Sequence, residues 1–312
     1  GLNSVDPEKY AGWNGELYGC ENDAEDMAMV VNSHGFEIMK LLTKDATCSN
    51  FERSIKQAAK ILNDGDIFLI SFSGHGGQMK DIDSDEENFL DSTWVFYDRQ
   101  LTDDELENLI RTNFSKQVRI LIISSAAHAG AAYIGRLINK KNQKSVSSSM
   151  KEMSPDTPRL EPELHITKPN KYIENLNTEK LNQLKNQTNS QQILEKKNNI
   201  NHLSSNRQDL LYILQRENAE DRELKTPIII FTGCKKNELD TETEVNGRVN
   251  GAFNYNMLKV LREKNFNFKG TYKQFYREIY KLSSLSSSEQ HPGYYVVGKR
   301  DKKFENQAPF TI

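Results

Sequence analysis

Residues 118–124 read VRILIIS, and this short run of branched apolar side chains decides the fold class. Two other segments share its character, DIFLISF at 66–72 and TPIIIFTGC at 226–234. Runs of this length that lack polar alternation are typical of strands buried on both faces of a sheet. The three segments therefore predict the central strands of an α/β fold.

Helical patterns separate the predicted strands. Apolar side chains recur at helical spacing in four further segments, 23–31, 54–62, 251–262 and 272–282. Thr102 and Glu105 have the spacing of a capping box, which predicts a helix start at this point. Residues 36–42 and 294–297 are predicted as two more strands. Strands that alternate with helices favour a mainly parallel central sheet with helices on its faces.

Composition and charge exclude several classes of protein. The 312 residues include 41 Lys and Arg against 44 Asp and Glu, a net charge of −3 that gives no reason to bind nucleic acid or an anionic membrane. No apolar run approaches the roughly 20 residues that span a bilayer. Cys20, Cys48 and Cys234 are too widely spaced for a disulfide framework or a CxxC zinc site. We expect a cytoplasmic monomer.

A polar segment divides the chain. Residues 139–225 are rich in Asn and Gln and poor in aromatic side chains, whereas 1–138 and 226–312 carry the apolar strand patterns. The two flanking segments are predicted as halves of one sheet. The segment between them is either a surface insertion of helices and linker or a regulatory segment that lies on the functional site.

Small and polar residues follow two of the predicted strands. SGHGG at 73–77 follows the strand at 66–72, and SAAHAG at 125–130 follows the strand at 118–124. Ligands of open parallel sheets bind beyond the carboxyl ends of the strands. Glycines beside His75 let the backbone approach a substrate and offer amide groups to an oxyanion. A lone histidine is usually structural, but this placement favours a functional role for His75.

These segments carry a family resemblance. SGHG at 73–76 and SAAHAG at 125–130 resemble the two active-site signatures of caspase-like cysteine peptidases, in the metacaspase and bacterial orthocaspase branch. LYGCENDA at 17–24 resembles a third motif of that branch. TGCK at 232–235, followed by NGAF at 250–253, resembles its small-subunit motif. Four motifs in the family's order are far more specific than any one of them.

The resemblance implies a fold and a domain organisation. The fold is the caspase-like α/β/α sandwich, with a mainly parallel sheet flanked by helices. Residues 1–138 correspond to the large-subunit half and 226–312 to the small-subunit half. Residues 139–225 correspond to the intersubunit linker, where we expect self-processing after basic residues. The candidate positions there are Lys140, Lys141, Arg159, Lys196 and Lys197.

The resemblance also implies a Cys–His dyad in a cysteine endopeptidase. His75 corresponds to the general base, and Gly76 with residue 127 would supply the oxyanion amides. The nucleophilic cysteine, however, corresponds to Ala127, which offers no thiol. One interpretation, which we favour, is an inactivating replacement of Cys by Ala. The alternative is a natural pseudoenzyme that binds peptides or a partner in the same groove.

Substrate preference follows from the same comparison. Asp23 corresponds to one of two aspartates that accept a substrate Arg or Lys side chain, with Cys20 and Ser73 beside it. The second aspartate corresponds to Ser125, so a single carboxylate is left to pair with the basic group. The expected partners are therefore protein or peptide substrates, including the chain's own 139–225 segment.

No cofactor is required by this chemistry, but the acidic stretch at 81–87 raises the question of calcium. Glu86 and Ser92 stand where an EF-hand needs glycine and glutamate, so this stretch is not an EF-hand. Asp91, Asp103 and Asp104 resemble acids of the calcium site in calcium-dependent members of the family. The alternative is a solvated acidic loop next to the charged first turn of a helix.

Overall fold

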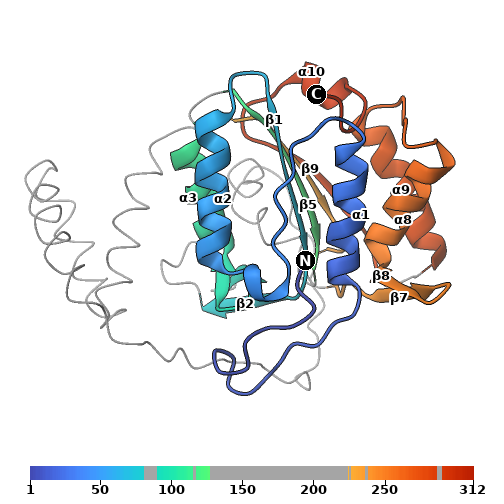
Figure 1. The fold of residues 1–312 in the computed structure, drawn as a ribbon. Coiled ribbons are helices and arrows are strands. Elements are labelled where there is room, and N and C mark those ends of the chain that lie inside the picture. Colours follow the sequence, from blue (N-terminus) through green and yellow to red (C-terminus); the bar gives the residue numbers. More distant parts are fainter. Residues whose placement is uncertain (81–89, 115–116, 127–223, 225, 236–237, 287–289) are drawn as a thin grey trace, which may run out of the picture. The chain divides into compact units, whose positions relative to one another are not determined.

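A four-stranded sheet forms the centre of the fold and takes strands from both halves of the sequence (Figure 1). The structure is a computed structural model that describes residues 1–80, 90–114, 117–126, 224, 226–235, 238–286 and 290–312. The strand order is β1-β5-β6-β9, with bounds β1 Ile67–Ser73, β5 Arg119–Ser125, β6 Ile228–Thr232 and β9 Gly293–Val297. β1, β5 and β6 are parallel, and β9 is antiparallel to β6. The predicted α/β class and mainly parallel sheet are confirmed.

Side chains of β5 alternate between two apolar cores. Ile120 and Ile122 belong to one core, and Leu121 and Ile123 belong to the other. All four side chains are at most 1% exposed. This double burial explains the unbroken apolar run, because a strand covered on both faces has no side facing water.

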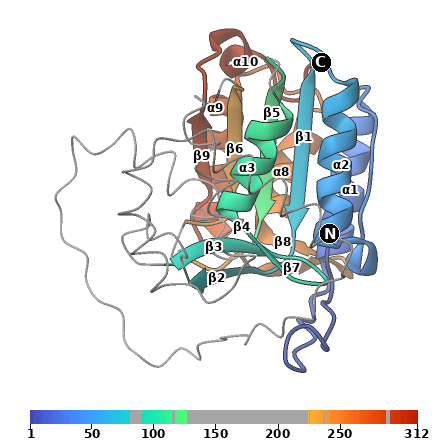
Figure 2. The same ribbon diagram turned by 90° about the vertical axis from the view of Figure 1, so that its left-hand side faces the viewer.

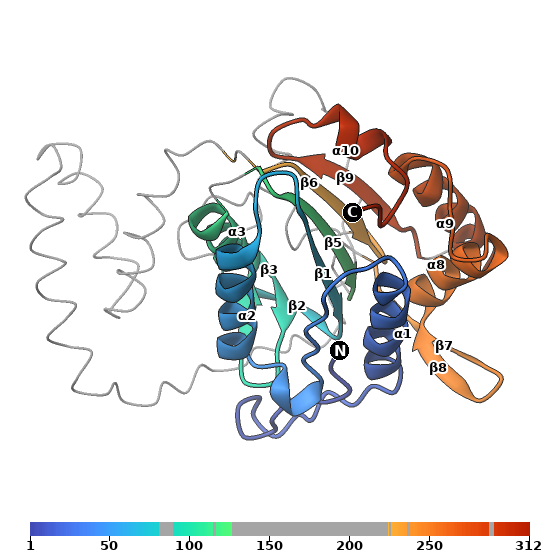
Figure 3. The same ribbon diagram turned by 45° about the horizontal axis from the view of Figure 1, so that its top comes forward.

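Helices cover both faces of the sheet (Figure 3). α2 and α3 pack on the face that contains Ile122, while α1, α8 and α9 pack on the face that contains Ile123. The described helices are α1 Cys20–Asn32, α2 Cys48–Ile61, α3 Asp103–Asn113, α8 Ala252–Glu263, α9 Tyr272–Ser286 and α10 Lys302–Asn306, with a 3-10 turn at Thr43–Asp45. No helix in the described part of the chain is long and apolar enough to cross a membrane.

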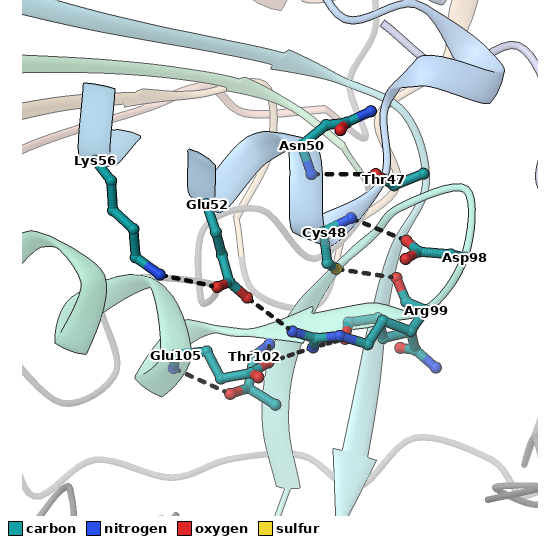
Figure 4. Close-up of polar contacts among 10 residues, drawn as sticks. Thr47, Cys48, Asn50, Glu52, Lys56, Asp98, Arg99, Thr102 and Glu105 are labelled. Carbon is teal, nitrogen blue, oxygen red and sulfur yellow. Dashed lines mark hydrogen bonds and ion pairs between the residues drawn. The ribbon is translucent and has the colours of Figure 1, made fainter. Parts of the chain in front are cut away.

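Polar side chains define where α2 and α3 begin (Figure 4). The Thr102 hydroxyl accepts from the Glu105 amide, and the Glu105 carboxylate accepts from the Thr102 amide, which confirms the capping box. Thr47 caps α2 by accepting from the Asn50 amide, so this helix starts six residues earlier than predicted. Arg99 contacts Glu105 at 2.8 Å and so holds the start of α3.

Residues 36–42 do not form the predicted strand. Ile38 and Met39 are 41% and 55% exposed. The segment's end contacts the start of the chain through two backbone hydrogen bonds, from the Gly1 amino group to Leu41 and from the Thr43 amide to Gly1. Two bonds do not make a strand ladder, so the apolar pattern alone was misleading here.

Two small antiparallel sheets were not predicted (Figure 2). One pairs β2 Gly76–Lys80 with β3 Leu90–Val95 and β3 with β4 Gln100–Thr102. The other pairs β7 Glu242–Val245 with β8 Arg248–Gly251. Asn246 and Gly247 join β7 to β8, both with positive φ, so the Asn-Gly pair was a hairpin signal in the sequence.

The halves 1–138 and 226–312 meet where β5 pairs with β6, from Ile120 beside Ile228 to Ser124 beside Thr232. Nearly all of the proposed linker 139–225 lies outside the described residues. The three-part organisation therefore stays a prediction, although the described strands of the two halves share one sheet.

Replacing Ile122 by Ala should lower the free energy of unfolding by about 3 kcal/mol, because the fully buried side chain leaves a cavity in the core. Ile61→Ala is the matched control: Ile61 is 62% exposed, and its truncation should change stability by less than about 0.5 kcal/mol. Denaturant unfolding measures both. Equal effects would contradict the assignment of β5 to the centre of the core.

Candidate active site

The loop that carries His75 follows the carboxyl end of β1. In the parallel β1–β5 pair, Ser73 lies beside Ser125. His75 follows Ser73 by two residues, and position 127 follows Ser125 by the same number. The Gly74 amide donates to the Ser125 carbonyl at 3.2 Å, which ties this loop to the end of β5.

The His75 ring is half-buried and oriented by the N-terminal loop. Its Nε2 donates to the Gly15 carbonyl at 3.2 Å, and the ring packs against Trp13 with centroids 4.8 Å apart. A carbonyl only accepts, so Nε2 holds the proton of the neutral ring and Nδ1 is the basic nitrogen. Burial lowers the pKa of His75, which favours the neutral form. Gly15 was not predicted, because a backbone carbonyl leaves no residue-type signal.

The nucleophile position cannot be placed beside this ring, because Ala127 lies outside the described residues. The expected closeness of its Cβ to the His75 ring thus stays a prediction. Gly76 is the first residue of β2, next to His75, and pairs with Trp94. The oxyanion role of Gly76 and residue 127 also stays a prediction.

A carboxylate is buried near the start of α1. Asp23 is 2% exposed and accepts from the Ser73 hydroxyl at 2.7 Å and from the Asn250 amide group at 2.9 Å. The Gly251 backbone amide donates to both of its oxygens. Burial raises the pKa of Asp23, and these hydrogen bonds oppose the rise. Ser73 is also hydrogen-bonded to Cys20, so three of the four predicted pocket residues contact one another.

The fourth predicted pocket residue, Ser125, donates to a carboxylate that sequence reasoning missed. Its hydroxyl lies 2.7 Å from Oδ2 of Asp240, in the segment after β6. The Gln290 side chain donates to Oδ1 of Asp240 at 2.6 Å. Burial, followed by the charge of Asp23, raises the pKa of Asp240 to about 7, although hydrogen bonds oppose the rise. The acidic character of the segment at 238–242 was the signal available in the sequence.

The caspase domain model matches residues 5–304, nearly the whole chain. This chain belongs to the caspase-domain family. The caspase domain is also similar in structure to a crystallised protein of Geobacter sulfurreducens. That similarity has a TM-score of 0.64 and 30% identity, and it covers 100% of this chain and 96% of the other.

Curated relatives of this caspase domain include fungal metacaspases. Metacaspase-1 of Ajellomyces capsulatus is 32% identical over 137 residues, which cover 39% of this chain and 38% of that protein. Metacaspase-1B of Neurospora crassa is 34% identical over 137 residues, covering 39% and 32%. The chain thus spans about a third of the length of these relatives.

The three cysteines of this caspase domain are buried and form no disulfide. Burial raises the pKa of Cys20 to about 12 and raises that of Cys48 as well. These two thiols therefore stay protonated at neutral pH, and a thiol is a poor nucleophile compared with a thiolate. The Cys234 thiol contacts the carbonyls of Ala126 and Glu238 at the end of β6.

The candidate calcium acids lie in β3 and in the first turn of α3. Asp91, Asp103 and Asp104 are all less than 9% exposed. Within the described residues, no group of three or more metal-ligating side chains is close enough to hold an ion. The acidic stretch 81–87 lies outside the described residues, so the weak calcium assignment of these three acids stays a prediction.

We expect an NMR titration of the caspase domain to give His75 a pKa below 6.5, the value of an unperturbed histidine, because the half-buried ring loses hydration when it is charged. Its resonance is assigned as the one that disappears in the His75→Gln variant. A ring that is largely protonated at pH 7 would contradict the assignment of neutral His75 with basic Nδ1.

Proposed function

We propose that this caspase fold is that of a cysteine endopeptidase whose nucleophile belongs at position 127. The observation that carries the proposal is the orientation of His75, whose Nε2 is committed to the Gly15 carbonyl, leaving Nδ1 as the base. Ser73 pairs in register with Ser125, and position 127 follows Ser125 by two residues, just as His75 follows Ser73. A base and a nucleophile at neighbouring strand ends are the elements of a Cys–His dyad.

The reaction would proceed through an acyl-enzyme. His75 Nδ1 takes the proton of a cysteine at position 127, and the thiolate adds to the scissile carbonyl carbon. The amides of Gly76 and residue 127 stabilise the oxyanion. The C–N bond breaks as His75 returns its proton to the leaving amine, and water then hydrolyses the thioester.

This chain has Ala127, so it lacks the sulfur that the reaction needs. We propose that Ala127 is an inactivating replacement, since the basic histidine and the buried pocket acid Asp23 are both retained. Ala127 also supports a second candidate, a pseudoenzyme that binds peptides as a scaffold. The codon at position 127 in the parent gene separates the two.

Substrate preference in this proposal is for Arg or Lys immediately before the scissile bond. Asp23 is buried with neutral hydrogen-bond donors around it, and a guanidinium can pair with such a carboxylate through two parallel hydrogen bonds. A substrate aspartate would meet like charge there. Self-processing in 139–225 fits this preference, because that segment carries several lysines and arginines.

Ala127→Cys should restore hydrolysis of a peptide substrate, and adding His75→Ala should then reduce kcat by at least about 100-fold through loss of the general base. His34→Ala in the restored protein is the control, because His34 contacts α1 rather than the predicted dyad. Release of a fluorogenic group measures all three. Absence of hydrolysis in the Ala127→Cys protein would refute the peptidase and favour the scaffold.

In the restored protein, Asp23→Asn should lower kcat/KM for an Arg substrate by about 10- to 100-fold, because the hydrogen bonds to a charged acceptor are lost. Glu25→Gln removes a charge from the same helix at an exposed site and should have little effect. The assay compares peptides that differ only in Arg, Lys, Leu or Asp before the scissile bond. Equal cleavage of all four peptides is the result that rules out this pocket.

A further inference from the structure

We propose that Asp240 is a second carboxylate of the Asp23 pocket and that the two acids together bind the basic side chain of the substrate. Asp240 thereby becomes a specificity-determining residue supplied by the second half of the sheet. The inference rests on the proposed function, because it names a further residue of the same pocket.

Ser125 links the two acids beside Gly251. The position that a Cβ on Gly251 would occupy is 2.8 Å from Oδ2 of Asp23 and 2.7 Å from Oγ of Ser125. The same Oγ donates to Oδ2 of Asp240 at 2.7 Å. Ser125 therefore stands between the carboxylates, and only a residue without a side chain fits beside them. A substrate cation reaching this point would be attracted by both acids.

The position of Asp240 is specified by its neighbours. Gln290 donates to Oδ1 of Asp240 and also to the Gly233 carbonyl, so one amide ties the carboxylate to the end of β6. A Cβ on Gly233 would lie 2.0 Å from Oδ2 of Asp240, so glycine is required for the carboxylate to lie there. Asp240 remains half-buried rather than fully enclosed.

Among the described residues, no Lys, Arg or His side chain forms an ion pair with either carboxylate, and the one cation that interacts with Asp23 is the terminal amino group of Gly1. The donors to Asp23 and Asp240 are hydroxyl, amide and backbone groups, all of them neutral. Asp26, one turn along α1 from Asp23, is by contrast paired with Arg248 at 2.9 Å. A buried acid such as Asp23, with the half-buried Asp240 nearby and no side-chain counter-charge, is costly unless a proton or a bound cation compensates it.

The raised pKa of both acids agrees with this interpretation. The charge of Asp23 contributes to the rise at Asp240, so the two groups act on each other electrostatically. Without a ligand, the unfavourable electrostatic energy of the two acids can be lowered by the uptake of a proton. A bound guanidinium lowers it instead by supplying a positive charge. The negative charge of the pocket is therefore of the kind that a bound cation would neutralise.

Binding tests the inference on the chain as it stands, without a nucleophile. The probes are N-acetyl-arginine amide and N-acetyl-citrulline amide, which have nearly the same shape but differ in charge. NMR titration should give the arginine probe the lower Kd, and Asp240→Asn should weaken arginine binding by about tenfold while leaving citrulline binding unchanged. Glu244→Gln, at an exposed site in β7, is the control and should change neither.

Moving the carboxylate from position 240 to position 125 tests whether Asp240 determines substrate specificity or only supports the structure. Because Oγ of Ser125 lies 2.7 Å from the Asp240 carboxylate, Ser125→Asp combined with Asp240→Asn returns an acid to nearly the same place. This double variant should recover most of the arginine preference that Asp240→Asn loses. If Asp240→Asn leaves the arginine-to-citrulline ratio unchanged, or the double variant fails to recover it while remaining folded, the inference is wrong.

Kinetics of the Ala127→Cys protein distinguish this inference from the proposed function. Hydrolysis after Arg that is insensitive to Asp240→Asn would overturn the role of Asp240 and leave the peptidase standing. Absence of hydrolysis would overturn the peptidase, and the binding experiment would still decide the role of Asp240. The supporting result is a loss of kcat/KM for Arg peptides of about tenfold, with citrulline peptides unaffected.

Discussion

The in-register parallel pairing of β1 with β5 is the constraint on which the site depends. It puts Ser73 beside Ser125, so the segments that follow these residues leave the sheet from the same edge. The Gly74 amide then fixes the first segment to the Ser125 carbonyl. A shift of one residue would turn the apolar side chains of β5 to the opposite faces of the sheet, and the two buried cores prevent that shift.

Charged side chains are arranged in two different ways in this caspase domain. Around α2 and α3, Arg99 lies within 4 Å of both Glu52 and Glu105, so positive and negative groups balance locally. Around Ser125, by contrast, the hydrogen-bond donors to Asp23 and Asp240 are all neutral, among the residues that the structure describes. The first arrangement holds helix starts together. The second leaves the two acids without a side-chain counter-charge, which is the physical basis of the specificity that we propose.

Short sequence patterns correctly predicted several elements of the fold. The run at 118–124 and the capping box of Thr102 and Glu105 are confirmed, because burial on both faces and side-chain capping act over a few residues. The prediction of a strand at 36–42 is wrong, because strand formation needs a partner strand. This segment has one backbone bond to Gly1, at Leu41, and a second bond to Gly1 comes from the next residue after it, Thr43. The Asn246–Gly247 hairpin was readable from the sequence but was not predicted.

The sequence by itself determined the α/β class and the family motifs, because these depend on residue types at short spacing. The resemblance carried by those motifs grouped Asp23 with Cys20 and Ser73, although Ser73 is 50 residues from Asp23. Only the tertiary structure decided that Asp240 joins Ser125 and that the Gly15 carbonyl orients His75. Asp240 is 115 residues from Ser125, and His75 is 60 residues from Gly15. Contacts over such separations arise from packing of the whole chain, and a backbone carbonyl contributes no side-chain signal from which the contact could be read.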